Sequence, residues 1–464
     1  MKKSSKFKVQ SSKVNVAFLW DESFLWGLMA YRTLKANGLD FELICSDDIR
    51  DGKLYDYKML FVPGGWASNK LKALGEDGVK NIREFVRQGG NYLGLCGGAG
   101  LATLNGINLL KVKRRPSKER VPSFSGRIYL NLNEHPVWKG IEDSGTKGQG
   151  IRGKGQENSS LVSRQARHPS LIFHAWWPSQ FLIYDNDIKV LATYGEALPD
   201  AFSSDLNVGD TEAGGGWAEI EKLYQINLDP GKLFNDPAVV EGKFGKGRAV
   251  LSLLHFDTPQ DRNGAEVLKN LWEYLAGYRM QDEKNHASCI LHHESYSPKI
   301  ISELEAVVTD LISLGMRNFL WFWRNSMLLQ WRRGIRGLEY CTLYVMIKEI
   351  AERVKNSNKF QVSSCEIKPP LHSLSKGGRE EIYMEHALRI KELLIPFIEK
   401  SKRLLILERH AMQNSLITYE KCNDSEIRDL RTELFSDSKN YAGMFKGLID
   451  EADNLLYALL KEEN

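Results

Sequence analysis

The stretch at residues 91–104 constrains the fold most, because it combines a strand, a tight turn and a helix. Residues 92–95 form a short apolar run typical of a buried strand, and residues 97–104 begin a helical pattern. Cys96 lies between them, with glycine at positions 94, 97, 98 and 100. Glycine permits a tight turn and leaves the sulfur uncrowded, and a helix start favours a thiolate. We predict a nucleophile elbow built on cysteine; the alternative interpretation is a buried structural cysteine on a glycine-rich turn.

Buried strands and helices alternate over the first hundred residues. Strand patterns cover residues 14–20, 41–45, 59–62 and 92–95, and helical patterns cover residues 24–37 and 77–88. This alternation predicts a parallel sheet with helices on both faces. The working site of such a sheet lies at the carboxyl ends of its strands. The residues that follow strands at that edge are Asp21, Glu22, Gly64, Gly65 and Cys96.

The same α/β pattern continues to about residue 280. Strand patterns cover residues 127–132, 173–184, 188–194 and 245–256, and residues 264–278 are helical. The strand at 245–256 delivers His255 to its end, and Asp257 follows two residues later. Polar stretches without periodicity at 141–167 and 195–217 are expected to be long loops. We predict an α/β domain over residues 13–280, preceded by a flexible N-terminus at residues 1–12.

Strand patterns disappear from about residue 285. Helical periodicity covers residues 298–314, 316–355, 379–412 and 425–461, with a polar connection at 355–376, which predicts an all-α bundle over 285–464. Residues 317–336 interleave Trp321, Trp323 and Trp331 with arginines, and we expect a helix there. Such a helix would lie in the core with its arginines along the bundle surface, or would rest on a membrane surface.

Composition limits the class of protein. The net charge of +4 over 464 residues is too small to argue for a nucleic-acid partner. Six cysteines without a C-x-x-C pair argue against structural zinc and a disulfide scaffold, so we expect neither metal nor cofactor. Without a signal-peptide pattern or a long uncharged apolar run, we expect a soluble cytoplasmic protein. The basic run at 111–120 is expected to be a solvated loop, with an anion-facing patch as the alternative.

A cysteine, a histidine and a carboxylate at one sheet edge supply the groups of covalent acyl transfer. Cys96 would attack a carbonyl, His255 would take and return the proton, and Asp257 would orient the imidazole. The backbone N–H groups of Gly65 and Gly97 would meet the developing oxyanion.

Four motifs resemble the class I glutamine amidotransferase superfamily, and within it the biotin-protein ligase N-terminal domain family. They are P-G-G-W at 63–66, F-V-R-Q-G-G at 85–90, Y-L-G-L-C-G-G-A-G at 92–100 and G-K-G-R-A-V-L-S-L-L-H-F-D at 245–257. The resemblance covers about residues 13–278 and implies a flavodoxin-like three-layer α/β/α fold with a mostly parallel sheet. It implies Cys96 as nucleophile, His255 as base, Asp257 as orienting acid, and Gly64 and Gly65 as the oxyanion-hole loop.

Two positions depart from the pattern that this resemblance implies. Gly100 stands where glutamine-hydrolysing members have a substrate-binding glutamine, and His255-Phe256-Asp257 replaces His-x-Glu. Glutaminase activity is therefore not expected. Biotin ligation is not expected either, because the helical region offers no ligase sheet and the one glycine- and arginine-rich stretch, at 148–155, lies inside the first domain.

Three hypotheses for function follow. The first is an amide or ester hydrolase that acts on a small-molecule substrate through Cys96. The second is a catalytically silent module that binds a small ligand or regulates, and whose helical domain engages a protein partner. The third is a redox or aldehyde-handling thiol, for which Glu22 would be the accessory acid near Cys96.

Overall fold

The computed structural model describes residues 14–141, 170–277, 298–361, 377–414, 418, 422–437 and 440–463. Several predictions from the sequence lie wholly or mostly outside these residues. They concern the N-terminus at 1–12, the loop at 141–167 with its stretch at 148–155, the boundary between the two domains at 280–285, and most of the connection at 355–376.

Five parallel strands form the part of the sheet that carries the predicted site. Their order is β2 (Glu42–Ile44), β1 (Val16–Leu19), β3 (Met59–Val62), β4 (Asn91–Leu95) and β13 (Gly247–Ser252). β1 and β3 are continuous apolar runs that are buried along their whole length, as strands covered on both faces must be. The parallel strands predicted from the sequence are confirmed.

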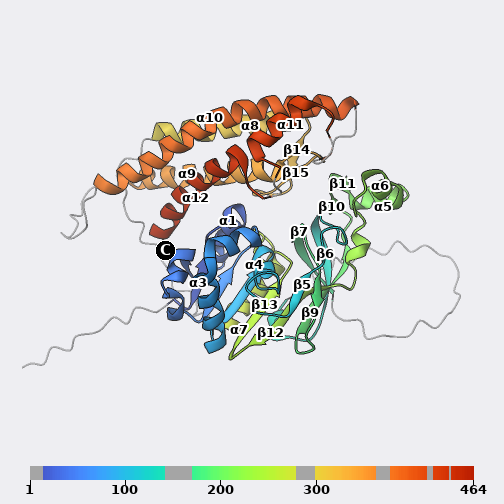
Figure 1. The fold of residues 1–464 in the computed structure, drawn as a ribbon, viewed down its shortest axis with the longest axis vertical. Helices are drawn as coiled ribbons and strands as arrows, with labels where there is room; N and C mark the ends of the chain where they lie inside the picture. Colours follow the sequence, from blue (N-terminus) through green and yellow to red (C-terminus); the bar gives the residue numbers. More distant parts are fainter. Residues whose placement is uncertain are drawn as a thin grey trace, which may run out of the picture.

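Helices cover both faces of these strands, which gives the three-layer arrangement visible in Figure 1. α1 (Phe24–Ala36) connects β1 to β2, and α3 (Ala67–Gln88) connects β3 to β4, in opposite directions along the sheet. Right-handed crossovers therefore place α1 and α3 on opposite faces. The other helical elements of this part are α2 (Ser46–Arg50), the 3-10 turn η1 (Lys53–Asp56), α4 (Gly97–Leu101) and α7 (Arg262–Ala276). The predicted flavodoxin-like α/β/α fold is confirmed.

Antiparallel strands extend the sheet beyond β13 to eleven strands. The path continues through β12 (Pro237–Phe244), β9 (Lys189–Ala197), β6 (Phe124–Leu132), β10 (Phe202–Ser203) and β11 (Leu206–Asn207), and β7 (Ser170–Trp176) also pairs with β6. β5 (Val112–Arg114) and β8 (Phe181–Ile183) form a separate ribbon. The prediction of one long loop at 195–217 is wrong, because β10, β11 and α5 (Val208–Ala213) lie within it.

Five long helices form the C-terminal part. They are α8 (Pro298–Arg317), α9 (Gly337–Gln361), α10 (Gly377–Asn414), α11 (Ser425–Phe435) and α12 (Gly443–Glu462). Figure 1 shows them as a layer laid across one end of the α/β part. The helical region predicted from the sequence is confirmed, but 425–461 is two helices, separated where Ser436 and Gly443 both take positive φ.

The predicted helix over residues 317–336 is wrong. After α8 the chain forms a hairpin of β14 (Trp321–Trp323) and β15 (Leu329–Trp331), in which Trp321 pairs with Trp331. Aromatic residues favour strands, and the Asn325 side chain accepts from the N–H groups of Met327 and Leu328 to close the turn. With no amphipathic helix there, neither the core-helix nor the membrane-surface interpretation holds.

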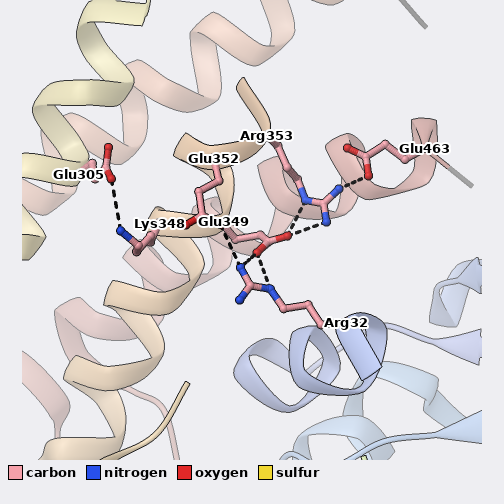
Figure 2. A network of polar contacts seen from close by, with 7 residues as sticks. All are labelled: Arg32, Glu305, Lys348, Glu349, Glu352, Arg353 and Glu463. Carbon is pink, nitrogen blue, oxygen red and sulfur yellow. Dashed lines mark hydrogen bonds and ion pairs between the residues drawn. The ribbon is translucent and has the colours of Figure 1, made fainter. Parts of the chain in front are cut away.

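Ion pairs join the helical part to α1. Figure 2 shows the Arg32 guanidinium of α1 donating to Glu349 of α9, which also accepts from Arg353. Deeper in the interface, Trp20 Nε1 donates to Asp453 Oδ1 of α12 at 3.0 Å, and this bond is buried. These contacts place the helical part against the carboxyl end of β1, next to the predicted site.

Candidate functional site

Cys96 occupies a strained turn between β4 and α4 (Gly97–Leu101). Its φ of 48° and ψ of −103° are uncommon for a residue with a side chain. Two backbone bonds hold the turn: Cys96 N donates to Ser252 O of β13 at 2.7 Å, and Gly100 N donates to Cys96 O at 2.9 Å. The half-buried sulfur thus sits at the carboxyl end of the parallel strands, on an elbow of the predicted form. The helix that follows is shorter than predicted.

The elbow is packed directly onto the loop that follows β3. A Cβ at Gly97 would lie 1.8 Å from Gly65 O, and one at Gly98 would lie 2.0 Å from Val62 O. Gly98 N donates to Pro63 O at 3.1 Å. Only glycine allows this approach, so the two backbone segments predicted to form the oxyanion hole, at Gly64–Gly65 and Gly97, lie against each other.

His255 follows β13 and is held by Asp257. His255 Nδ1 lies 2.9 Å from Asp257 Oδ1, and both side chains are 0% exposed. The loop is fixed by a bond from Thr33 Oγ1 of α1 to Asp257 O at 2.8 Å. Since a carboxylate can only accept, Nδ1 carries the proton and Nε2 is left for another group. His255 Nε2 is buried and has no hydrogen-bond partner of regular geometry in the part of the chain that the structure describes.

The thiol and the imidazole polarise each other. Burial alone would raise the pKa of the Cys96 thiol, but the neighbouring His255 outweighs it and holds this pKa below its ordinary value. Burial likewise opposes a charged His255, but Asp257 and Cys96 raise its pKa to about 10. The pair is therefore favoured as thiolate and imidazolium, the form in which a cysteine attacks.

Tryptophan side chains line one side of the site. The Trp26 ring lies 4.7 Å from the His255 ring, Trp177 lies 5.7 Å from Trp26, and Trp331 stacks on Trp177 at 5.2 Å. Trp331 belongs to β15, so the hairpin of the helical part supplies the last ring in this row of aromatic contacts. A Cβ at Gly64 would lie 3.0 Å from His255 Cε1, which places the loop after β3 against the same ring.

Lys70 is a buried lysine next to the site that the sequence did not reveal. It is 0% exposed, and its Nζ donates to Asp21 O at 2.8 Å and also to Ser23 Oγ. Its Cε lies 3.3 Å from the position of a Cβ at Gly65, so it supports the candidate oxyanion loop from behind. Burial lowers the pKa of Lys70 to about 7. In the sequence it looks like any lysine of an amphipathic helix, because nothing local marks its burial.

Arg114 and Arg120 of the basic run also face the site. The Arg114 guanidinium lies over Gly100: a Cβ there would be 2.8 Å from Arg114 Cζ. Its charge lowers the pKa of the Cys96 thiol further, after the larger effects of burial and of His255. The position at which the family resemblance places a substrate-binding glutamine is thus filled by an arginine from β5.

Glu22 does not take the role of accessory acid. Its carboxylate accepts from Lys446 Nζ of α12 at 3.1 Å and from Asn69 Nδ2 at 3.1 Å. Both carboxylate oxygens are therefore used to join the helical part to α3, and the redox hypothesis that placed Glu22 beside the thiol loses its acid.

The described residues hold neither a metal-binding cluster nor a membrane-spanning helix. No group of three or more His, Cys, Asp and Glu side chains among them has an arrangement that could hold a metal ion. Within the same part of the chain, no helix combines the length and the apolar character needed to cross a membrane.

One family model matches the chain. Residues 54–105 match the family described as "Biotin-protein ligase, N terminal", and this segment contains three of the four motifs on which the resemblance was based. The resemblance predicted from the sequence is therefore confirmed for the region that includes the loop after β3 and the Cys96 elbow. No curated protein matches the chain.

Three solved structures are similar to slightly more than half of this chain. A protein from Thermoplasma acidophilum, described as a component of GMP synthase, is 12% identical, with a TM-score of 0.34, over 57% of this chain and 96% of its own. A structure described as glutamine amidotransferase is 18% identical, with a TM-score of 0.31, over 57% and 99%. A segment of β-galactosidase from Bacillus circulans sp. alkalophilus is 13% identical, with a TM-score of 0.32, over 56% and 31%. Similarity at this level is too low to carry function to this chain.

Proposed function

We propose that the α/β part is a cysteine-dependent acyl hydrolase that cleaves a small amide or ester through Cys96. The observation that carries this proposal is the position of His255. One of its ring nitrogens is held by a buried carboxylate, and the other has no regular hydrogen bond to a described residue, while His255 is close enough to Cys96, in its strained turn, for each to shift the pKa of the other. This is the relationship of nucleophile, base and orienting acid that acyl transfer requires.

The first half-reaction forms a thioester. The Cys96 thiolate attacks the carbonyl carbon, and the carbonyl electron pair moves to oxygen, next to the backbone N–H groups of Gly65 and Gly97. The tetrahedral intermediate then expels the amine or alcohol, which takes the proton from His255 Nε2. The acyl group remains on sulfur, and His255 is neutral.

The second half-reaction consumes one water molecule. His255 Nε2 takes a proton from the water as its oxygen attacks the thioester carbon. Collapse of the intermediate releases the carboxylic acid and leaves the thiolate and imidazolium as they were at the start. Asp257 keeps the imidazole in the correct tautomer through both steps, while the Trp26 ring packs against the imidazole at 4.7 Å between ring centroids.

We assign neither glutamine hydrolysis nor biotin ligation. The side chain that would bind a glutamine amide is absent at Gly100, and the Arg114 guanidinium occupies its space. Biotin ligation needs a separate catalytic domain on a mixed sheet, whereas the described residues from 298 onward form five long helices and one short hairpin.

Covalent trapping tests the proposal. Wild-type protein treated with a panel of activated acyl esters should gain one acyl mass on Cys96, as located by peptide mapping, and should then lose it by hydrolysis. Cys96→Ser should lose the thioester, and His255→Ala should slow both its formation and its decay. Cys45 is the internal control, because it is a half-buried free thiol whose pKa is raised by burial. Acylation of Cys45 at the same rate as Cys96 would contradict the proposal.

A silent binding module is the second candidate. It is favoured by Arg114, which closes the space used by the amide handle in glutamine-hydrolysing members, and by the tryptophan wall beside His255, a surface suited to holding a ligand. In that case, ligands would raise the melting temperature of wild type and of Cys96→Ser equally, and no acyl adduct would form with any ester.

A further inference from the structure

We propose that the Cys96 site selects substrates with an anionic group, above all a carboxylate, and that Arg114 and Arg120 bind this group. The substrate class is half-amides or half-esters of small dicarboxylic acids. This inference rests on the proposed function for the chemistry at sulfur, but the anion site itself stands on separate observations. Those observations are the placement of two arginines and what surrounds them.

Arg114 is aimed at the elbow and its side chain has no partner of its own. β5 pairs with β8, with Arg114 opposite Phe181, and this ribbon places the guanidinium over Gly100. Gly100 lies one helical turn beyond Cys96 and is bonded to its carbonyl. Among the described residues, the Arg114 side chain makes neither an ion pair nor a hydrogen bond.

Arg120 lies within electrostatic reach of the same sulfur. Its Nη2 donates to Ser117 Oγ at 3.1 Å, while its Nε is buried and without a hydrogen-bond partner. Burial lowers the pKa of Arg120, the charge of Arg114 lowers it further, and the Cys96 thiolate raises it. A buried guanidinium N–H without an acceptor is costly, and an anion that enters the site would supply one.

A neighbouring arginine shows what an arginine with a structural role looks like in this segment. Arg115 Nη2 lies 3.1 Å from both carboxylate oxygens of Asp236, so its charge is neutralised, although its Nε, like that of Arg120, is buried without a hydrogen-bond partner among the described residues. Arg114 and Arg120 have no such carboxylate in the described part of the chain. The basic run is thus divided between a structural ion pair and two cations that face Cys96.

The balance of charge around the sulfur favours an anion. The thiolate and imidazolium cancel, Asp257 adds one negative charge, and Arg114 and Arg120 add two positive charges. Tyr194, which also lies in reach of the thiol, stays neutral because burial raises its pKa. Acylation removes the thiolate and imidazolium charges together, so the positive charge of the two arginines still exceeds the charge of Asp257 when the substrate's second carboxylate must be retained.

A matched pair of alkylating reagents tests the anion site without any need for turnover. Iodoacetate is anionic and iodoacetamide is neutral, and both transfer a similar group to sulfur with loss of iodide. The measured quantity is the ratio of their rates at Cys96 relative to the same ratio at Cys45, from peptide mapping of one sample. We expect the Cys96 ratio to exceed the Cys45 ratio by about 10- to 100-fold, since a charge-assisted hydrogen bond is worth about 1.5–3 kcal/mol.

Variants assign the effect to the arginines. Arg114→Gln and Arg120→Gln should each lower the ratio at Cys96 several-fold, whereas Lys118→Gln should not change it. Lys118 is the matched control, because it is an exposed cation of the same segment with no ion pair to another described residue. An equal ratio at Cys96 and Cys45 in wild type, or a ratio unchanged in both arginine variants, overturns the inference. If Arg114→Gln unfolds, Gly100→Ala displaces the guanidinium without removing it and should lower the ratio instead.

Binding to Cys96→Ser separates this inference from the proposed function. Calorimetry with glutarate and with inorganic phosphate should show binding that Arg114→Gln abolishes, and tighter binding of glutarate identifies the carboxylate as the preferred anion. Arginine-dependent glutarate binding without any acyl adduct in wild type would refute the hydrolase and keep the anion site. An acyl adduct that forms equally well with charged and neutral esters would support the hydrolase and refute the anion site. Tighter binding of phosphate than of glutarate would overturn the assignment to carboxylates.

Discussion

Asp257 Oδ1 lies 2.9 Å from His255 Nδ1, and water reaches neither side chain. The bond fixes which ring nitrogen faces Cys96, since the proton must lie on Nδ1. Asp257 Oδ2 has no hydrogen-bond partner among the described residues, so the bond to the imidazole is the only one to this carboxylate within that part of the chain. This relationship is the basis of the first two predictions.

Asp257→Asn should impair Cys96 without unfolding the protein. The amide is isosteric, but its carbonyl and amino groups leave the imidazole tautomer unfixed and its positive charge uncompensated. We expect the rate of Cys96 acylation to fall by about 100-fold or more, as in triads that lose their acid. Stopped-flow kinetics with an activated ester measures it, and a melting temperature within a few degrees of wild type shows that the fold is retained. A rate equal to wild type would remove Asp257 from the mechanism.

The pH dependence of alkylation follows from the direction of the two pKa shifts. The pKa of Cys96 is lowered, so its thiolate persists as pH falls below the ordinary thiol value, whereas Cys45, whose pKa is raised, is already protonated. In wild type, the rate ratio of Cys96 to Cys45 with iodoacetamide should therefore grow as pH falls from 9 to 7. His255→Gln removes the neighbouring charge, so the Cys96 rate should then follow an ordinary or raised pKa. Parallel pH profiles for both cysteines would contradict an ion pair between the Cys96 thiolate and the His255 imidazolium.

The Asp453 carboxyl makes the interface between the two parts sensitive to pH. Burial and the nearby carboxylates of Asp21 and Asp450 raise its pKa, while the bond from Trp20 Nε1 opposes this. A carboxyl with a raised folded-state pKa stabilises the protein below its unfolded-state pKa, and this stability is lost as pH rises through the folded-state value. Asp453→Asn keeps an acceptor for Trp20 and cannot ionise.

We therefore expect Asp453→Asn to stabilise the protein above the folded-state pKa of Asp453, by about 1–3 kcal/mol. Denaturant unfolding monitored across pH 4 to 8 should show a smaller decline for the variant than for wild type. Trp20→Phe, which removes the donor and leaves the ionisable group, should keep the decline and lower stability at every pH. Parallel curves for wild type and Asp453→Asn would show that Asp453 does not ionise in this interface.

The charge network on α9 gives a prediction about the same interface. Glu349 is buried and accepts from both Arg32 and Arg353, so Glu349→Ala leaves two guanidinium groups without this acceptor (Figure 2). Because Arg32 is about one-third exposed, solvent screens part of the loss, and we expect about 1–3 kcal/mol of destabilisation. Lys348→Ala is the control: its pair with Glu305 is looser at 3.7 Å and more exposed, and its removal should cost less than about 0.5 kcal/mol.

The sequence predicted the parts of the site that strand ends determine. Cys96, His255 and Asp257 could be brought together because parallel strands meet at one edge and because the glycine pattern at residues 94–100 permits a tight turn there. The groups that tune the site could not be found in this way. Arg114 depends on how the β5 ribbon folds back over Gly100, and Lys70 depends on its burial against Gly65.

Long-range partners and ambiguous periodicity explain the errors. The carboxylate of Glu22 is taken by Lys446, 424 positions away, which no local pattern could reveal. Residues 317–336 were expected to be helical because tryptophans spaced two and eight apart fit several periodicities, and aromatic residues are common in strands. Tertiary contacts favour the hairpin over a helix: Trp331 stacks on Trp177, and Arg324 lies over the Phe202 ring at 4.7 Å.

Substitution by alanine should have different effects on stability at two glycines of α4. At Gly97 a methyl group would lie 1.8 Å from the backbone oxygen of Gly65, and neither backbone can move without opening the elbow. At Gly100 the nearest atoms belong to the Arg114 guanidinium, the far end of a flexible side chain that can swing away. Gly97→Ala should therefore lower the free energy of unfolding by about 2 kcal/mol or more and slow acylation of Cys96. Gly100→Ala should leave stability within about 1 kcal/mol of wild type, because alanine also favours a helix.

The two variants should also differ in how Cys96 reacts with charged and with neutral reagents. Gly100→Ala should still form the acyl adduct with neutral esters but should lose its preference for iodoacetate, since the guanidinium is displaced while Cys96 and His255 remain in place. Gly97→Ala should react slowly with charged and neutral reagents alike. Urea unfolding and the two alkylation rates, measured on both variants, check this. Equal stability of the two variants would show that the elbow does not rest on the loop after β3, because the contact at Gly97 is with a rigid backbone and the contact at Gly100 is not.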